Sequence, residues 1–264
     1  VTTVSPSYAR EIQTPEFGCG LEGVIATRTA DLVGLLNGID DSVWNPATDP
    51  LLPARYTADD PSGKAKCRRA LLKKCGFDPE TKAPIFGMIC RLTEQKGLDL
   101  LLGARRFFET EDCRLIVVGM GQNHYEAALQ ELAQANPSRI ALARVLDEPM
   151  THLVEAGADF FLMPSIFEPC GLNQMYSQRY GTIPLCSRVG GLVDTVVDEE
   201  DVPADGTGLL FTPSEQGLSW ALQRTLLLHR HPEKMKAMID RGMRRDFGWT
   251  TAARRYEQLY NDEI

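Results

Sequence analysis

Short apolar segments alternate with helical segments through the middle of the chain, from about residue 83 to residue 199. The apolar segments are nearly uninterrupted, as in strands that are buried on both faces of a sheet. The expected strands cover residues 83–90, 113–119, 139–145, 159–165 and 182–188. The expected helices cover residues 97–109, 125–135, 148–157, 171–181 and 192–199. This alternation predicts βαβ units, and therefore a doubly wound α/β domain with a parallel sheet.

The flanking regions have different patterns. Residues 35–56 are rich in Pro, Asp and Asn without a period, which predicts a long ordered loop. Residues 64–76 form a basic amphipathic pattern that Gly76 closes, which predicts a helix with a solvated face. The first twelve residues are typical of a strand that runs into a helix. Three further helices are expected at residues 214–230, 232–247 and 250–260.

The composition excludes several classes of protein. The chain has 28 Lys and Arg against 36 Asp and Glu, and its net charge of −8 argues against a nucleic-acid-binding surface. No apolar run is long enough to cross a membrane, and no signal peptide is visible. The seven cysteines are scattered and the four histidines lack ligand spacing. We therefore expect free thiols in a reducing compartment and no metal site.

The candidate site residues follow the expected strands, at the sheet edge where doubly wound domains bind their ligands. Arg91 and Lys96 belong to the loop after the first strand, and two cations at this spacing suit a diphosphate. Their spacing alone fits two surface cations equally well. Gly119 and Gly121 follow the second strand, but the dinucleotide fingerprint they begin is incomplete, which favours a tight turn.

Two more loops carry candidate residues. Glu168 and Cys170 precede a helix that is expected to begin near Gly171, where free N–H groups favour an anion. A carboxylate in this position can accept hydrogen bonds from ligand hydroxyl groups, or it can cap the helix. Cys170 would need a neighbouring base to act as a nucleophile, and the sequence identifies none. Gly190 and Gly191 would let backbone N–H groups approach a phosphate, or form a plain turn.

The chain resembles the bacterial glycogen synthases and plant starch synthases through motifs that occur in a specific order: VSPSYAREI, NGID with WNPATD, GMICRLTEQKGLDLLL, SIFEPCGLNQMYSQRYGTIP and GGLVDTV. The likeness runs from Val1 to about Tyr260. It implies a GT-B glycosyltransferase with two Rossmann-like lobes, of which this chain resembles the C-terminal lobe. It also implies transfer of glucose from ADP-glucose to the non-reducing end of an α-1,4-glucan, with retention and without a metal or cofactor.

The resemblance divides the chain into three parts. Residues 1–30 would be the tail of an N-terminal lobe, and residues 31–247 the nucleotide-sugar-binding lobe. Residues 248–264 would include a helix that crosses back to the N-terminal lobe. The N-terminal lobe itself would lie outside this chain, so we expect the chain to be inactive alone. The protein would be cytoplasmic in a bacterium and plastidic in a plant or alga.

The resemblance also implies roles for individual residues. Glu168 would bind the donor glucose and stabilise a cationic transition state, while Arg91 and Lys96 would neutralise the departing diphosphate. The substrate-binding residues would be Asn37, Cys170, Gly171, Leu172, Gly190 and Gly191.

The sequence departs from the family pattern at the nucleotide. Val189 stands where a Thr often precedes the two glycines, and Val145 and Leu146 stand where Gly and an aromatic residue usually lie beside the adenine. These departures leave the choice between ADP-glucose and UDP-glucose open. They slightly favour an alternative, a non-catalytic module that binds a nucleotide sugar or a glucan, whereas the retained Arg91, Lys96 and Glu168 disfavour it. A dehydrogenase is disfavoured by the incomplete glycine fingerprint.

Overall fold

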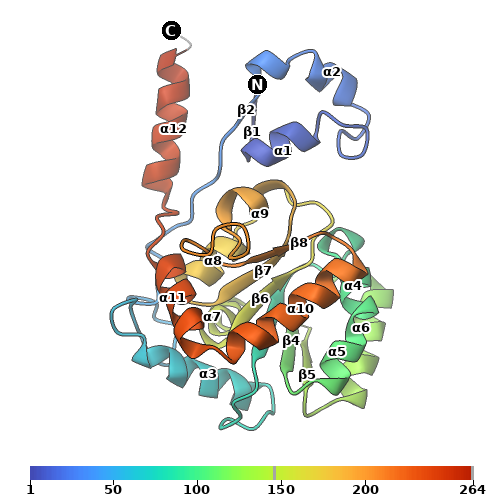
Figure 1. The fold of residues 1–264 in the computed structure, drawn as a ribbon, viewed down its shortest axis with the longest axis vertical. Helices are drawn as coiled ribbons and strands as arrows, with labels where there is room; N and C mark the ends of the chain where they lie inside the picture. The colour runs from blue at the N-terminus through green and yellow to red at the C-terminus, as the bar shows by residue number, and fades with distance from the viewer. Residues whose placement is uncertain (145–146, 263–264) are drawn as a thin grey trace.

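Six parallel strands form the central sheet of the computed structural model, which describes residues 1–144 and 147–262. The strands are β3 (Ile85–Ile89), β4 (Arg114–Val118), β5 (Ile140–Ala143), β6 (Phe160–Met163), β7 (Ile183–Ser187) and β8 (Leu209–Phe211). Their order in space is β5-β4-β3-β6-β7-β8, so the winding reverses between β3 and β6 (Figure 1). The five expected strands and the doubly wound parallel sheet are confirmed. The sequence did not predict β8, which has only three residues.

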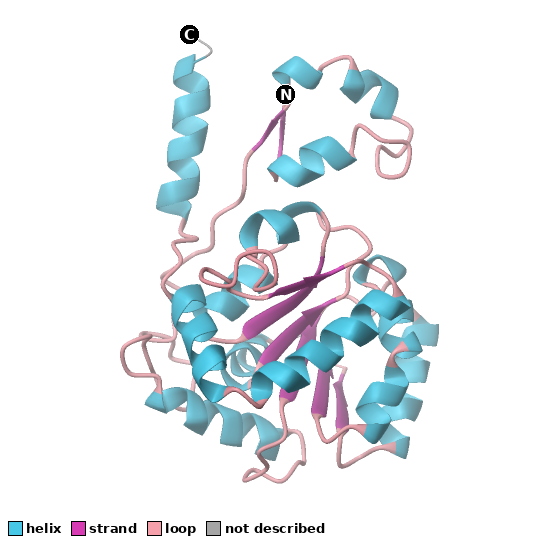
Figure 2. Cartoon of the chain, viewed as in Figure 1, coloured by secondary structure: helices cyan, strands magenta, loops and turns pink. Residues whose placement is uncertain are grey.

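Helices cover both faces of the sheet (Figure 2). Successive residues of a strand face opposite cores: Phe86 and Met88 belong to one buried cluster, and Ile85 and Ile89 belong to the other. The first cluster includes residues of α4 (Leu98–Gly103), α5 (Arg105–Thr110), α6 (Asn123–Ala135) and α10 (Glu215–His229). The second includes residues of α3 (Ser62–Lys74), α7 (Glu148–Gly157) and α9 (Gly190–Thr195). Apolar burial on both faces explains why the strands lack a polar alternation.

Two expected helices differ from the structure. The segment 97–109 is divided into α4 and α5 at Ala104, whose N–H still bonds back to Leu100. The expected helix at 192–199 is wrong beyond Thr195, because Val196 has extended dihedral angles. Asp198 instead forms a bridge with Gly208. The expected helices at 171–181 and 232–247 correspond to α8 (Asn173–Arg179) and α11 (Pro232–Met243).

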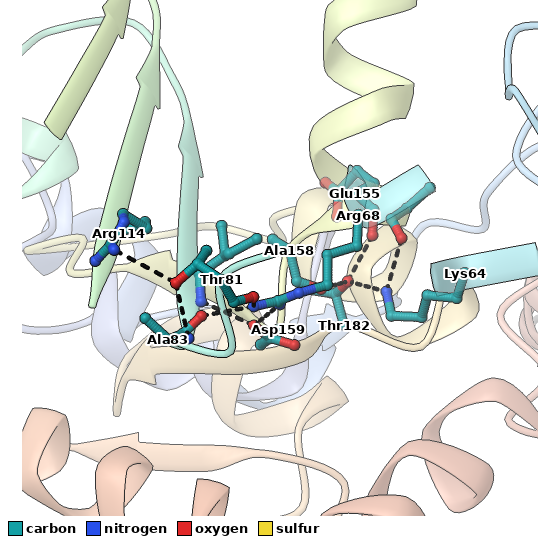
Figure 3. A network of polar contacts seen from close by, with 11 residues as sticks. Lys64, Arg68, Thr81, Ala83, Arg114, Glu155, Ala158, Asp159 and Thr182 are labelled. Atoms are coloured by element: carbon teal, nitrogen blue, oxygen red, sulfur yellow. Dashed lines mark hydrogen bonds and ion pairs between the residues drawn. The ribbon is translucent and has the colours of Figure 1, made fainter. Parts of the chain in front are cut away.

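A polar network holds α3 against the amino ends of the strands (Figure 3). The Lys64 ammonium donates to the Thr182 hydroxyl at 2.8 Å and to two backbone carbonyls. Arg68 forms an ion pair with Asp159, whose carboxylate also accepts the N–H of Ile85 at 2.8 Å. Thr182, Asp159 and Ile85 lie at or just before strand starts. The network therefore fixes the edge of the sheet that faces away from the expected ligand site.

The two ends of the chain lie on the opposite side, beyond the carboxyl ends of the strands (Figure 1). The strand-then-helix expected at the start is confirmed as β1 (Thr2–Thr3) and α1 (Pro6–Glu11), followed by α2 (Glu22–Ala26). β1 pairs with β2 (Val33–Gly34), and α1 packs against α9. The last helix, α12 (Trp249–Asp262), projects away from the sheet beside this N-terminal segment. The assignment of these two parts to another lobe stays a prediction.

Candidate active site

A cleft of about 540 Å³ lies where the winding of the sheet reverses, at the carboxyl ends of β3 and β6. Doubly wound sheets bind ligands at this switch point, because the loops of neighbouring strands diverge there and leave a crevice. Seven of the nine site residues expected from the sequence line the cleft: Asn37, Arg91, Lys96, Glu168, Cys170, Gly171 and Leu172. Three loops far apart in the chain thus converge on one site.

The centre of the cleft is an ion pair between two of the expected residues. The Lys96 ammonium lies 2.6 Å from Oε2 of Glu168, and the hydroxyl of Ser165 donates to the same oxygen at 3.1 Å. Only 8% of the Glu168 side chain and 20% of the Lys96 side chain are exposed. Such burial is costly unless a charge is paired. The pairing fixes the carboxylate and places a positive charge directly beside it.

Two hydrogen bonds of Gln95 and a close approach at Gly97 hold the loops of Lys96 and Glu168 together. The carbonyl of Gln95 accepts the N–H of Ile166 at 2.9 Å, and its side-chain amide donates to the carbonyl of Phe167 at 2.6 Å. Gly97 follows with a φ of +69°, and a Cβ there would lie 1.8 Å from the carbonyl oxygen of Pro164. Only glycine tolerates this approach. The position of Lys96 relative to Glu168 is therefore set by the main chain.

The interpretation of Glu168 as a helix cap is wrong. Helix α8 begins at Asn173, and its N-cap position is occupied by Leu172, without a side-chain capping bond. The carboxylate of Glu168 instead bonds to Lys96 and Ser165. It therefore belongs to the cleft and not to the helix terminus.

Cys170 lines the cleft in surroundings that disfavour a thiolate. Burial raises the pKa of the Cys170 thiol, and the negative charge of Glu168 raises it further, although a backbone N–H from Asn37 has the opposite effect. A nucleophilic cysteine needs a lowered pKa. The surroundings of Cys170 therefore argue against a nucleophilic role, and its role in the cleft is to form part of the wall.

Sequence reasoning missed three residues that organise this site. Ser165 bonds to Glu168, and the side chain of Asn173 donates to the carbonyl of Ile89 at 3.0 Å, which ties α8 to the end of β3. The buried amide of Gln174 donates to the carbonyls of Cys170 and Gly171, both at 3.0 Å. The available signal was that these polar residues lie within three positions of the EPCGL segment, residues 168–172. The hydrogen-bond partners of these residues could not be predicted from the sequence, because they depend on the fold.

The two remaining expected residues, Gly190 and Gly191, do not line the cleft. The N–H of Gly190 donates to Oε1 of Glu11 at 2.7 Å, and the N–H of Gly191 donates to the carbonyl of Glu168 at 2.9 Å. Both amides thus have partners within the chain. A phosphate contact at these glycines stays a prediction.

The expected nucleotide preference remains a prediction as well. Val189 is buried and lies before α9, whereas Val145 and Leu146 lie outside the described residues. Within residues 1–144 and 147–262, no three His, Cys, Asp or Glu side chains gather as metal ligands would. No helix in the described part of the chain is long and apolar enough to cross a membrane.

Two separate parts of the chain match known protein families. Residues 76–245 match the family described as "Glycosyl transferases group 1", and residues 1–27 match the family described as "Starch synthase catalytic domain". The first match spans the six-stranded sheet and all the cleft-lining residues except Val4 and Asn37. The second spans the segment that carries α1 and α2.

Comparison with individual proteins gives whole-chain similarity. A glycogen synthase from Opitutus terrae is 59% identical over all 264 residues, and glycogen synthase 1 from Methylococcus capsulatus is 47% identical over 268 aligned positions. The chain spans 55% and 54% of these relatives, or about half of their length.

A solved structure is also similar over the whole chain. The catalytic domain of starch synthase IV from Arabidopsis thaliana, bound to ADP and acarbose, is 38% identical with a TM-score of 0.93. The match covers 99% of this chain and 55% of that one. Sucrose-phosphate synthase from Thermosynechococcus elongatus, at 20% identity and a TM-score of 0.66, shares the fold.

Proposed function

Because the chain belongs to the glycosyl transferases of group 1, we propose that it is the donor-binding half of a glucosyltransferase of the glycogen and starch synthase type. The reaction would move glucose from ADP-glucose to the non-reducing end of an α-1,4-glucan, with retention at the anomeric carbon. The observation that carries this proposal is the buried pair of Lys96 and Glu168 in the cleft between β3 and β6. This pair would present a carboxylate to the sugar and a cation to the diphosphate of the donor.

The chemistry of the transfer requires these two charges side by side. The bond between the glucose C1 and the diphosphate oxygen breaks, a bond from C1 to an acceptor hydroxyl oxygen forms, and ADP and a proton are released. Positive charge develops on the sugar ring while negative charge develops on the diphosphate. Glu168 would stabilise the first charge, and Lys96 with Arg91 would stabilise the second. Preorganised charges of this kind are the largest contribution to catalysis in many enzymes.

The neighbouring backbone would complete the donor pocket. Cys170, Gly171 and Leu172 form the wall next to Glu168, and Asn37 approaches from the loop after β2. Oε2 of Glu168 is held by Lys96 and Ser165. Oε1 makes no hydrogen bond within the described residues, so it would accept the hydroxyl groups of the donor glucose.

The acceptor would bind to a part of the enzyme outside this chain. The relatives are nearly twice as long. Helix α12 and the N-terminal segment extend beyond the carboxyl ends of the strands (Figure 1), and the residues that line the cleft also lie at these ends. We propose that these two parts contact an N-terminal lobe, which would close over the cleft and exclude water. The chain alone would then bind the donor but transfer no glucose.

The direct test uses the protein at its natural length with labelled ADP-glucose and a maltooligosaccharide. We expect elongation of the oligosaccharide and release of ADP, whereas the 264-residue chain should give neither. Parallel reactions with UDP-glucose determine the nucleotide preference. A natural-length protein that binds ADP-glucose without any turnover would support the non-catalytic module instead.

A further inference from the structure

Helix α1 docks on α9 through two contacts at opposite ends of the helix. At the start of α1, the N–H and the hydroxyl of Ser7 donate to the carboxylate of Asp194, at 2.9 and 2.7 Å. At its end, the carboxylate of Glu11 accepts the N–H of Gly190 at 2.7 Å. The two contacts share one interface, but only the second reaches the glycine turn beside the cleft.

The turn at Gly190 and Gly191 is in direct contact with the backbone of Glu168. Gly190 has a φ of +43°, and a Cβ there would lie 2.0 Å from the carbonyl oxygen of Glu168. Gly191 donates its N–H to the same oxygen at 2.9 Å. A Cβ at Gly191 would lie 2.2 Å from the carbonyl oxygen of Cys170. A shift of this turn must therefore move the main chain that carries Glu168.

Glu11 holds the other side of the turn at an energetic cost. One carboxylate oxygen bonds to Gly190, while Oε2 is buried without a partner among the described residues. Burial raises the pKa of the Glu11 carboxyl group, the negative charge of Asp194 raises it further, and the hydrogen bond from Gly190 has the opposite effect. A buried oxygen without a partner is unfavourable, so stability alone is a poor explanation for this side chain.

We propose that Glu11 is a positioning residue of the active site. It fixes the Gly190–Gly191 turn from outside the cleft, and through that turn it sets the backbone of Glu168. Glu11 does not line the cleft, so it acts only through this turn. The N-terminal segment is thereby linked mechanically to the carboxylate that faces the donor. The inference rests on the proposed function, because it takes Glu168 as the residue that stabilises the transition state.

Three variants of the natural-length protein test this role. Glu11→Ala removes the acceptor for Gly190, Glu11→Gln keeps an acceptor oxygen, and Ser7→Ala weakens the same interface without contact to the turn. We expect Glu11→Ala to lower kcat about tenfold or more while KM for ADP-glucose changes less than about twofold, because misplacement of a catalytic group affects mainly the transition state. Glu11→Gln and Ser7→Ala should stay within about threefold of the wild-type kcat.

Thermal melts accompany the kinetics. If Glu11→Ala and Ser7→Ala lower both Tm and kcat to the same degree, or if Glu11→Gln is as slow as Glu11→Ala, Glu11 is merely structural and the inference is wrong.

A spectroscopic measurement separates this inference from the proposed function. In ¹H–¹⁵N spectra of the 264-residue chain, Glu11→Ala should shift the amide resonances of Gly190, Gly191 and Glu168, and Ser7→Ala should leave those of Gly191 and Glu168 in place. If the wild-type protein transfers no glucose but these shifts occur, the proposed function fails and the mechanical link stands. Unchanged Gly191 and Glu168 resonances in Glu11→Ala would overturn the link, whatever the activity.

Discussion

Glu168 and Lys96 are 72 residues apart in the chain and form one charged unit in the cleft. Each side chain offsets the desolvation of the other, and Ser165 donates a further hydrogen bond to Glu168. When a diphosphate enters beside Lys96, the ammonium can contact both the phosphate and the carboxylate. In the proposed reaction, the pair would therefore stabilise the two charges that develop as the glucosyl bond breaks.

At the residue scale, Glu168→Gln in the natural-length protein should lower kcat by about 10²-fold or more, the size of effect found for one preorganised electrostatic group. KM for ADP-glucose should change little, because the cations that hold the diphosphate remain. Steady-state kinetics measure both quantities. Glu94→Gln, an exposed change on the neighbouring loop, is the control for a general loss of charge. A kcat near the wild-type value with a lowered Tm would make the ion pair purely structural.

A second residue-scale prediction concerns Glu155, which is buried with both carboxylate oxygens unpartnered among the described residues (Figure 3). Burial raises the pKa of the Glu155 carboxyl group well above its usual value, despite the nearby positive charge of Lys64. The unfolded chain thus releases this proton at lower pH than the folded chain does. The protonation of Glu155 therefore makes its full contribution to the free energy of unfolding below about pH 4.5. This contribution decreases as the pH rises toward the pKa of the folded state.

The Glu155→Gln variant should therefore gain stability relative to wild type as the pH rises from 5 to 7.5. The difference should grow with pH until the pH passes the folded pKa of Glu155, because only the wild-type protein must keep this buried group protonated. The interval stays below the pKa of Lys64, which burial lowers to about 8. Denaturation at both pH values measures the effect. Glu131→Gln, at an exposed position of α6, should give no pH-dependent difference; a parallel trend in both variants would contradict the prediction.

At the element scale, the contact between the loop after β3 and the end of β6 depends on Gly97. Replacing Gly97 with Ala adds a Cβ 1.8 Å from a backbone oxygen of Pro164, in addition to the cost of a positive φ. Gly76, at the end of α3, also has a positive φ, but a Cβ there would meet nothing within 4 Å. Both glycines therefore have a left-handed backbone conformation, but only at Gly97 would an added Cβ clash with a neighbouring residue.

Urea denaturation of the 264-residue chain should reveal this difference. Gly76→Ala should cost about 1 kcal/mol, from the left-handed conformation alone. Gly97→Ala should cost more than about 3 kcal/mol, since the clash involves main-chain atoms that cannot move independently. It should also separate Lys96 from Glu168 and weaken ADP binding. Equal losses of stability in the two variants would mean that the loops are not held as tightly as their contacts indicate.

At the scale of the whole molecule, the net charge of −8 opposes the binding of an anion. Under the proposed function, ADP binding by this chain would then come from local cations, chiefly Arg91 and Lys96. We expect calorimetry to show weak binding of ADP, with an affinity that decreases as the salt concentration is raised from about 50 to about 500 mM, because salt screens exposed charges. Arg91→Ala should weaken binding about tenfold, which equals about 1.4 kcal/mol.

Arg106→Ala provides the matched control for this measurement, because Arg106 is exposed on α5 and does not line the cleft. It removes the same charge from the molecule and should leave ADP binding nearly unchanged. Equal effects of the two substitutions would mean that net charge, rather than the placement of Arg91, governs binding. Binding that is indifferent to salt would exclude both cations from the site.

Much of the architecture could be predicted from the sequence because it depends on local and periodic features. Continuous apolar segments such as 113–119 can be buried only between two layers of helices, which determines a parallel sheet wound in both directions. The same alternation places Arg91 and Glu168 after strands, and hence at one edge of the sheet. Strand β8 could not be predicted in this way, because Leu209–Phe211 is too short to show a period.

Only the tertiary structure decided which side chains meet. The sequence indicated Lys96 for a phosphate and Glu168 for a sugar, yet their bond depends on the order of β3 and β6 in the sheet. Glu11 and Gly190 are 179 residues apart, and their contact requires α1 to lie on α9. Hydrogen bonds and ion pairs act over a few ångströms, whereas sequence patterns report only neighbours along the chain. Local sequence patterns therefore indicated which residues belong to the site. The packing of the whole domain determined which of these side chains bond to one another.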